Sequence, residues 1–113
     1  MAEKLDISIN TTLAEDTNFD GKLNFEKSVK ICGKFKGEIS TNGILIISET
    51  ACVSANINAK IVIILGEVKG NIKASEKVEI LTGGRVYGDI TTAKLKISDG
   101  VIFEGSCHML KEE

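Results

Sequence analysis

The apolar positions of this chain follow a motif that occurs six times. In each copy an apolar residue is followed two places later by a small residue and four places later by another residue of the buried type. Successive copies begin 16, 18, 15, 18 and 17 residues apart. A repeat of nearly fixed period is typical of a solenoid, in which each repeat packs only against its neighbours. The copies are Phe19-Gly21-Leu23, Phe35-Gly37-Ile39, Val53-Ala55-Ile57, Val68-Gly70-Ile72, Val86-Gly88-Ile90 and Phe103-Gly105-Cys107.

Between these copies lies a second element with a period of two. Such alternation of β-branched and leucine residues predicts a strand whose side chains point alternately into and out of the fold. The glycine motif alternates in the same way: Val86, Gly88 and Ile90 face one side, and Tyr87 and Asp89 face the other. We expect the first and third residues of the following triplets to face inward: Val29-Lys-Ile31, Ile44-Leu-Ile46, Ile61-Val-Ile63, Val78-Glu-Ile80 and Leu95-Lys-Ile97.

These patterns predict an all-β fold, a parallel β-helix of about six rungs with about three short faces. Adjacent rungs would lie about 4.8 Å apart. A glycine, or Ala55 in one copy, leaves room where a narrow coil turns a corner. A β-sandwich gives no reason for six copies of one motif, and spacings of 15 to 18 residues do not keep the register of a hexapeptide acyltransferase helix.

Composition narrows the classes of function. The chain has 113 residues, enough for one small core. Its net charge of −2, with 14 basic and 16 acidic residues interspersed, argues against binding to nucleic acid. No apolar run is long enough to span a membrane, and residues 1–10 do not resemble a secretory signal. Three well-separated cysteines, Cys32, Cys52 and Cys107, fit a reducing cytosolic setting.

Candidate residues for catalysis or metal binding are few. His108 is the only histidine and lies near the chain end, and the adjacent Cys107 would point to the opposite face of a strand. The sequence contains no closely spaced ligand pairs of the kind that zinc needs and no glycine-rich phosphate loop. We therefore expect no enzyme activity, no catalytic or metal site and no cofactor.

The repeated unit resembles the bactofilin family of bacterial cytoskeletal proteins over about residues 17–109. The segments that carry the resemblance are Gly66-Glu-Val-Lys-Gly-Asn-Ile72, Gly84-Arg-Val-Tyr-Gly-Asp-Ile90 and Ile97-Ser-Asp-Gly-Val-Ile-Phe-Glu-Gly105. The resemblance implies a right-handed, triangular β-helix that polymerises end to end without nucleotide. It also implies cytoplasmic filaments that support cell shape or localise wall-synthesis enzymes or polarity proteins.

The extent of the repeats and of the resemblance predicts a flexible tail at residues 1–16, a β-helix at 17–109 and a short tail at 110–113. Residues 1–4 show no apolar or lysine-rich membrane motif. The sequence therefore does not decide whether the chain associates peripherally with the inner face of the membrane.

A β-helix exposes unpaired backbone groups and an apolar cross-section at each end unless caps cover them. Either the tails fold over the ends, or the ends bind further copies. The expected end contacts are Phe19, Leu23, Val101, Phe103 and Met109.

Placing Ile44 and Ile46 inward leaves an outward apolar stripe in the middle of the solenoid. Such a patch is rarely left bare. One hypothesis is that Leu5, Ile7 and Ile9 of the N-terminal tail cover it, and another is that a neighbouring filament does. The alternative function is a monomeric β-helical binding module that docks a partner protein through this face, as in the β-helical domain of cell-division inhibitors. The predicted stripe comprises Leu45, Ile47, Val62, Ile64 and Leu81.

Overall fold

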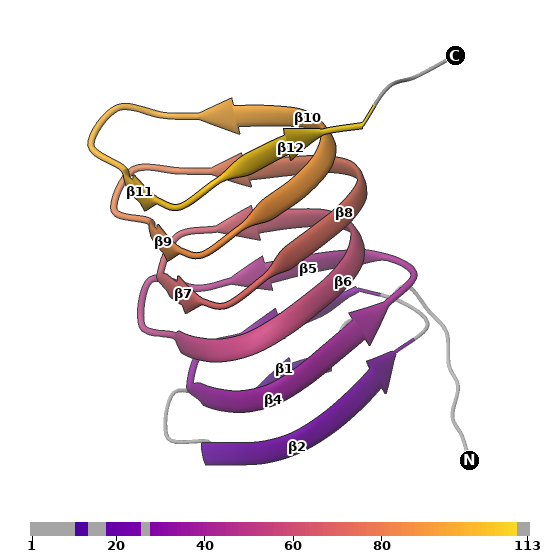
Figure 1. The fold of residues 1–113 in the computed structure, drawn as a ribbon. Coiled ribbons are helices and arrows are strands. Elements are labelled where there is room, and N and C mark those ends of the chain that lie inside the picture. The colour runs from indigo at the N-terminus through magenta and orange to yellow at the C-terminus, as the bar shows by residue number, and fades with distance from the viewer. Residues whose placement is uncertain (1–10, 14–17, 26–27, 111–113) are drawn as a thin grey trace.

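The chain folds into a coil of short parallel strands stacked along one axis (Figure 1). The structure is a computed structural model that describes residues 11–13, 18–25 and 28–110. The tail residues Leu5, Ile7 and Ile9 therefore lie outside the described residues. The strands are β1 (Thr11–Leu13), β2 (Asn18–Phe25), β3 (Val29–Ile31), β4 (Lys34–Thr41), β5 (Ile44–Ile47), β6 (Cys52–Ile64), β7 (Glu67–Lys69), β8 (Ile72–Ile80), β9 (Arg85–Tyr87), β10 (Ile90–Ile97), β11 (Ile102–Glu104) and β12 (Cys107–Met109).

The strands form three faces, and on each face six strand segments pair in parallel. Face A contains β1, β3, β5 and the C-terminal parts of β6, β8 and β10. Face B contains the N-terminal parts of β2, β4 and β6, followed by β7, β9 and β11. Face C contains the C-terminal parts of β2 and β4, the middle of β6, the N-terminal parts of β8 and β10, and β12. The predicted all-β parallel solenoid is confirmed. Its first strand, β1, lies within the segment that the sequence assigned to the tail.

The core consists of columns in which the same inward position recurs on successive coils. On face B, Phe35, Val53, Val68 and Val86 stack in register and are almost fully buried. On face C, a second column of almost fully buried side chains runs through Ile39, Ile57, Ile72 and Ile90. The predicted inward direction of the glycine motif is therefore confirmed at these positions.

The predicted direction of the outward stripe on face A is wrong for four of its five residues. Leu45, Ile47, Val62 and Ile64 are fully buried, whereas Leu81 is half-buried on the outside. The side chains of Ile44, Ile46, Ile61 and Ile63 point outward instead and are half-buried.

The pairing between coils sets the inward direction on face A. Leu45 and Ile47 lie in register with the inward Val29 and Ile31, which places them inside as well. The corner between faces C and A does not keep a period of two in every coil, because the ladder of β6 with β8 shifts between Ala59 and Ile61, and that of β10 with β8 shifts between Thr92 and Lys94. A one-residue change in spacing reverses the direction of the side chains that follow it.

A column of small residues forms the corner between faces B and C. Gly88 has a φ of 141°, a backbone conformation that residues with a side chain rarely adopt. A Cβ atom at Gly88 would also collide with the backbone carbonyl of Gly70 in the coil below. Gly21, in the first coil, has a similar φ of 146°, but a Cβ atom there would make only ordinary van der Waals contact, since the nearest atom of the Phe19 ring would lie 3.4 Å from it.

Alanine substitutions at Gly21 and Gly88 allow the cost of backbone strain to be distinguished from the cost of a collision between coils. We expect Gly21→Ala to cost only the strain, about 1–3 kcal/mol of unfolding free energy. Gly88→Ala adds the collision with Gly70, so it should destabilise the fold clearly more than Gly21→Ala does. Thermal unfolding of both variants, followed by circular dichroism, measures the difference. Equal losses at the two positions would show that contact between coils does not select glycine in this column.

Candidate assembly surfaces

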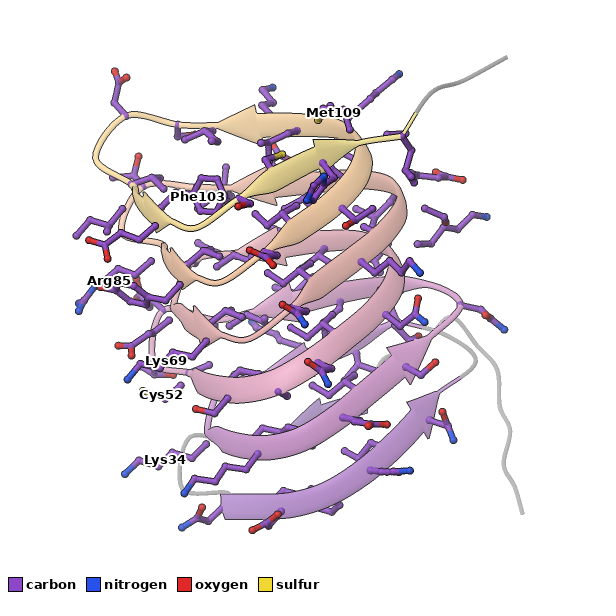
Figure 2. The ribbon with its side chains drawn as sticks, viewed as in Figure 1. Lys34, Cys52, Lys69, Arg85, Phe103 and Met109 are labelled. Atoms are coloured by element: carbon purple, nitrogen blue, oxygen red, sulfur yellow. The ribbon has the colours of Figure 1, made fainter. Side chains whose placement is uncertain are left out.

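The last coil exposes side chains at positions that are fully buried one coil earlier. Ile97 occupies the column of Ile80; the exposed fraction of Ile97 is 46%, whereas that of Ile80 is 0%. Met109 lies in register with Thr92 of the coil before; Thr92 is fully buried, whereas Met109 is 53% exposed. Figure 2 shows Met109 and Phe103 in this terminal coil. Within the described residues, the inward columns of the solenoid thus end in an apolar surface rather than in a polar cap.

Four further side chains of this surface are partly buried against the core. Phe103 stands in register above Val86, and Leu95 above Val78. Val101, Phe103 and Met109 were predicted here from the sequence, whereas Leu95, Ile97 and Cys107 were missed. The signal was available, because Leu95 and Ile97 belong to the last alternating triplet, Cys107 belongs to the last glycine motif, and all three were predicted to face inward. The complete C-terminal surface, defined here as the C-terminal end, consists of Leu95, Ile97, Val101, Phe103, Cys107 and Met109.

The outer backbone edge of this coil is also open within the described residues. β11 pairs only with β9, and β12 pairs only with β10. Their other edges carry N–H and C=O groups that could pair with a further strand. The C-terminal end therefore offers both an apolar surface and unpaired strand edges.

The N-terminal end also combines apolar side chains with an open strand edge, but fewer side chains take part. Phe19 and Leu23 of β2 are half-buried and pack against the core. The Phe19 ring stacks on that of Phe35 in the next coil, with ring centroids 5.1 Å apart and planes 9° from parallel. Among the described strands β2 pairs only with β4, so one edge of β2 is open.

A third apolar surface lies on the outside of face A. We call it the isoleucine patch. Its members are half-buried side chains on the middle coils, and their neighbours on the flanking coils include Lys30, Lys77 and Glu79. The patch comprises Ile44, Ile46, Ile61 and Ile63, extended at its edge by Leu65 and Leu81.

The described residues contain no cluster of three or more potential metal ligands. His108 is exposed, and Cys32, Cys52 and Cys107 are free thiols. Charged side chains form ion pairs at the surface, such as Lys22 with Glu38 at 3.8 Å, which contribute little to stability. Where the structure describes the chain, it has no helix of the length and hydrophobicity that a membrane span requires.

A family model described as "Bactofilin: Polymer-forming cytoskeletal" matches residues 11–108, almost the whole described solenoid. The chain belongs to the bactofilin family. Bactofilin BacO of Myxococcus xanthus is 38% identical over 104 residues, which are 92% of this chain and 82% of the relative. Bactofilin BacP of the same organism is 34% identical over 100 residues, which are 88% of this chain but 42% of BacP.

A solved bactofilin structure has the same architecture. The cryo-EM reconstruction of Thermus thermophilus bactofilin double helical filaments superposes with a TM-score of 0.82 at 31% sequence identity, covering 86% of this chain and 96% of that one. The bactofilin assignment made from the sequence is therefore confirmed. This chain is a member of a family of polymer-forming cytoskeletal proteins.

The contrast between the last two coils generates a prediction. Ile80→Lys should unfold the chain, because it buries a charge in a column with no exposed surface. Ile97→Lys, one coil later, should change the unfolding free energy by less than about 1 kcal/mol, because the ammonium group can reach water. Far-ultraviolet circular dichroism and the yield of folded protein distinguish the two outcomes. An unfolded Ile97→Lys variant would mean that a cap covers the C-terminal end.

Proposed function

We propose that this bactofilin assembles end to end into filaments through its two terminal coils, without nucleotide. The observation that carries the proposal is the exposure of Ile97 and Met109 in columns that are otherwise fully buried. Stacking a further subunit on this end would remove apolar surface from water and pair open strand edges at the same time. Burial of each such side chain contributes about 1.5–3 kcal/mol before the entropic cost of association.

The proposed contacts are those expected from the sequence, extended by the structure. Phe19 and Leu23 form the N-terminal contact. Val101, Phe103 and Met109, together with Leu95 and Ile97, form the C-terminal contact. The filaments of the Thermus thermophilus relative support polymerisation of a solenoid of this kind. They also support pairing of two filaments, because that relative forms double helical filaments.

In the cell we propose a scaffolding role for these filaments. A polymer built from stacked coils presents the same outer faces at every subunit and so offers repeated binding sites along its length. Such a surface suits the support of cell shape or the placement of wall-synthesis or polarity proteins in the cytoplasm, at the inner face of the membrane. Imaging a fluorescently labelled chain in cells tests this role, and a uniform distribution through the cytoplasm would contradict it.

The isoleucine patch favours a second candidate function. A monomer could bind a partner protein through this face, and the open ends would then be covered by other parts of the chain. The two functions differ in the state of the purified protein, since the binding module is a monomer and the scaffold is a polymer.

The proposed end contacts predict assembly in plain buffer. Purified chain should form unbranched filaments with neither ATP nor GTP added, and with EDTA present to remove divalent metal ions. Nothing in the proposed end contacts requires a nucleotide or a metal. Negative-stain electron microscopy and light scattering are the measurements. A monodisperse monomer at high protein concentration would contradict the scaffold and favour the binding module.

A charged substitution tests the C-terminal contact. Phe103→Arg should leave the chain folded but prevent assembly at this end, because a guanidinium group buried in a dry contact without a partner costs several kcal/mol. The matched variant is Val86→Arg, in the same column one coil earlier, where the side chain is fully buried. Val86→Arg should unfold the chain. Normal filaments from Phe103→Arg would remove this side chain from the end contact.

A further inference from the structure

The isoleucine patch lies in the middle of face A, with charged residues on both sides along the solenoid axis. One outward column on this face runs through Lys30, Ile46, Ile63, Glu79 and Lys96, each in register with the next. Two isoleucines therefore stand between a lysine on one side and a glutamate on the other. The neighbouring column contributes Ile44 and Ile61, which pair in register across the same two coils.

This column is complementary to itself when one copy is turned over. A twofold axis parallel to the strands and midway between β5 and β6 places Ile46 against Ile63 of a second copy. The same rotation places Lys30 of each copy against Glu79 of the other, because the two residues lie at equal distances from the axis. Such an isologous contact uses one patch on both subunits.

The other face-to-face twofold arrangement is disfavoured by charge. An axis parallel to the solenoid would place each residue of this column against the same residue of the second copy. Glu79 would then face Glu79, and Lys96 would face Lys96. Like charges across a contact are destabilising, whereas opposite charges fix its register. The pattern on face A thus favours a second copy with its solenoid axis antiparallel.

Glu79 is held in place by two lysines of its own subunit. Its side chain is only 19% exposed, and it already pairs with Lys77 at 3.7 Å and Lys96 at 3.9 Å. Those lysines hold the carboxylate at the rim of the patch. A third outward column runs through Cys32, Ser48, Leu65 and Leu81, where backbone hydrogen bonds continue the ladder. The same rotation sets the small Ser48 against Leu65 of the second copy and Cys32 against Leu81. Small residues facing large ones allow the two surfaces to approach closely.

We propose that the isoleucine patch is the lateral contact through which two filaments of this chain pair, each contact joining two subunits with antiparallel solenoid axes in a register set by Lys30 and Glu79. This inference rests on the filaments proposed above and names the surface that joins them.

The small size of the patch fits a partner that is itself a polymer. Ile44, Ile46, Ile61 and Ile63 span only about 7 Å along the strands and about 5 Å between coils. A contact centred on them is far smaller than the ~800 Å² per partner of a stable complex of standard size. Two isolated subunits would bind weakly through it, whereas two filaments repeat the contact at every subunit and gain avidity.

A charge swap tests the register. Lys30→Glu and Glu79→Lys should each lower the fraction of paired filaments at least about tenfold, and the double variant should restore pairing to within about threefold of the unmodified chain. Within one subunit the two residues are three coils apart, roughly 14 Å at 4.8 Å per coil. This separation exceeds the Debye length of about 8 Å at physiological ionic strength, so rescue by the swap requires contact between copies. Lys36→Glu, an equivalent charge reversal on face B of the same coil as Lys30, should leave pairing unchanged.

Cryo-electron microscopy of each variant counts paired and single filaments. Loss of pairing in the single variants with rescue in the double variant supports the proposal. Unchanged pairing in every variant, or single filaments from the unmodified chain, overturns it and leaves end-to-end assembly standing. A chain that forms no filaments at all overturns the proposed function and this inference together.

Ile46→Lys and deletion of residues 1–10 identify other occupants of the patch. Ile46→Lys should yield single filaments, in agreement with the charge variants. If Ile46→Lys instead keeps pairing but abolishes co-sedimentation with vesicles containing phosphatidylglycerol, the patch contacts lipid and the proposal is wrong. It is also wrong if pairing appears only after residues 1–10 are deleted, because the N-terminal segment then covers the patch.

Discussion

The whole molecule depends on stacking of each coil against a coil on either side. Parallel pairing satisfies the backbone of a strand only when neighbours are present at both edges, and the inward columns exclude water only when they continue. In the middle of the chain both conditions hold, and residues such as Val62, Val68 and Val86 have no exposed surface. At the last coil both conditions fail together. The exposure of Ile97 and Met109 is therefore a consequence of the architecture, and it gives assembly and folding the same chemical basis.

The glycine column shows how closely the coils must approach for this stacking to work. At Gly88 there is no room for even a methyl group above the carbonyl of Gly70. Ala55 occupies the equivalent position in the third coil. The corner between faces B and C thus tolerates one exception while the register of the column is maintained. Close contact at this corner brings the larger side chains on either side into columns without gaps, and it explains why the most regular feature of the sequence is a small residue.

Much of the fold could be predicted from the sequence because polar residues mark the outward positions of most strands. In Val29-Lys30-Ile31 and Val78-Glu79-Ile80 the central charge fixes which side chains are buried. In Ile44–Ile47 and Ile61–Ile64 every residue is apolar, so the period of two gives no direction. There the direction is set by the pairing between coils, in which Leu45 lies in register with the inward Val29 and with Val62, a tertiary feature that no local pattern reveals. The end contacts were partly predicted, and Leu95 and Ile97 were missed because the last alternating triplet was treated as interior.

Because the side chains of face A point in the opposite direction to the one predicted, a different set of apolar residues is available for contact with other molecules. With Leu45 and Val62 inside, the residues outside are four isoleucines, and the column that contains Ile46 and Ile63 is flanked by Lys30 and Glu79. The ends and this patch then differ in kind. The ends combine strand edges with a cross-section of the core, and the proposed end-to-end contact rests on this combination. The patch offers a small apolar area and one pair of opposite charges, which become effective only when many copies are held in line. We infer an order of assembly from this difference. Stacking of coils comes first and creates the repeated side surface, and pairing of filaments follows from it.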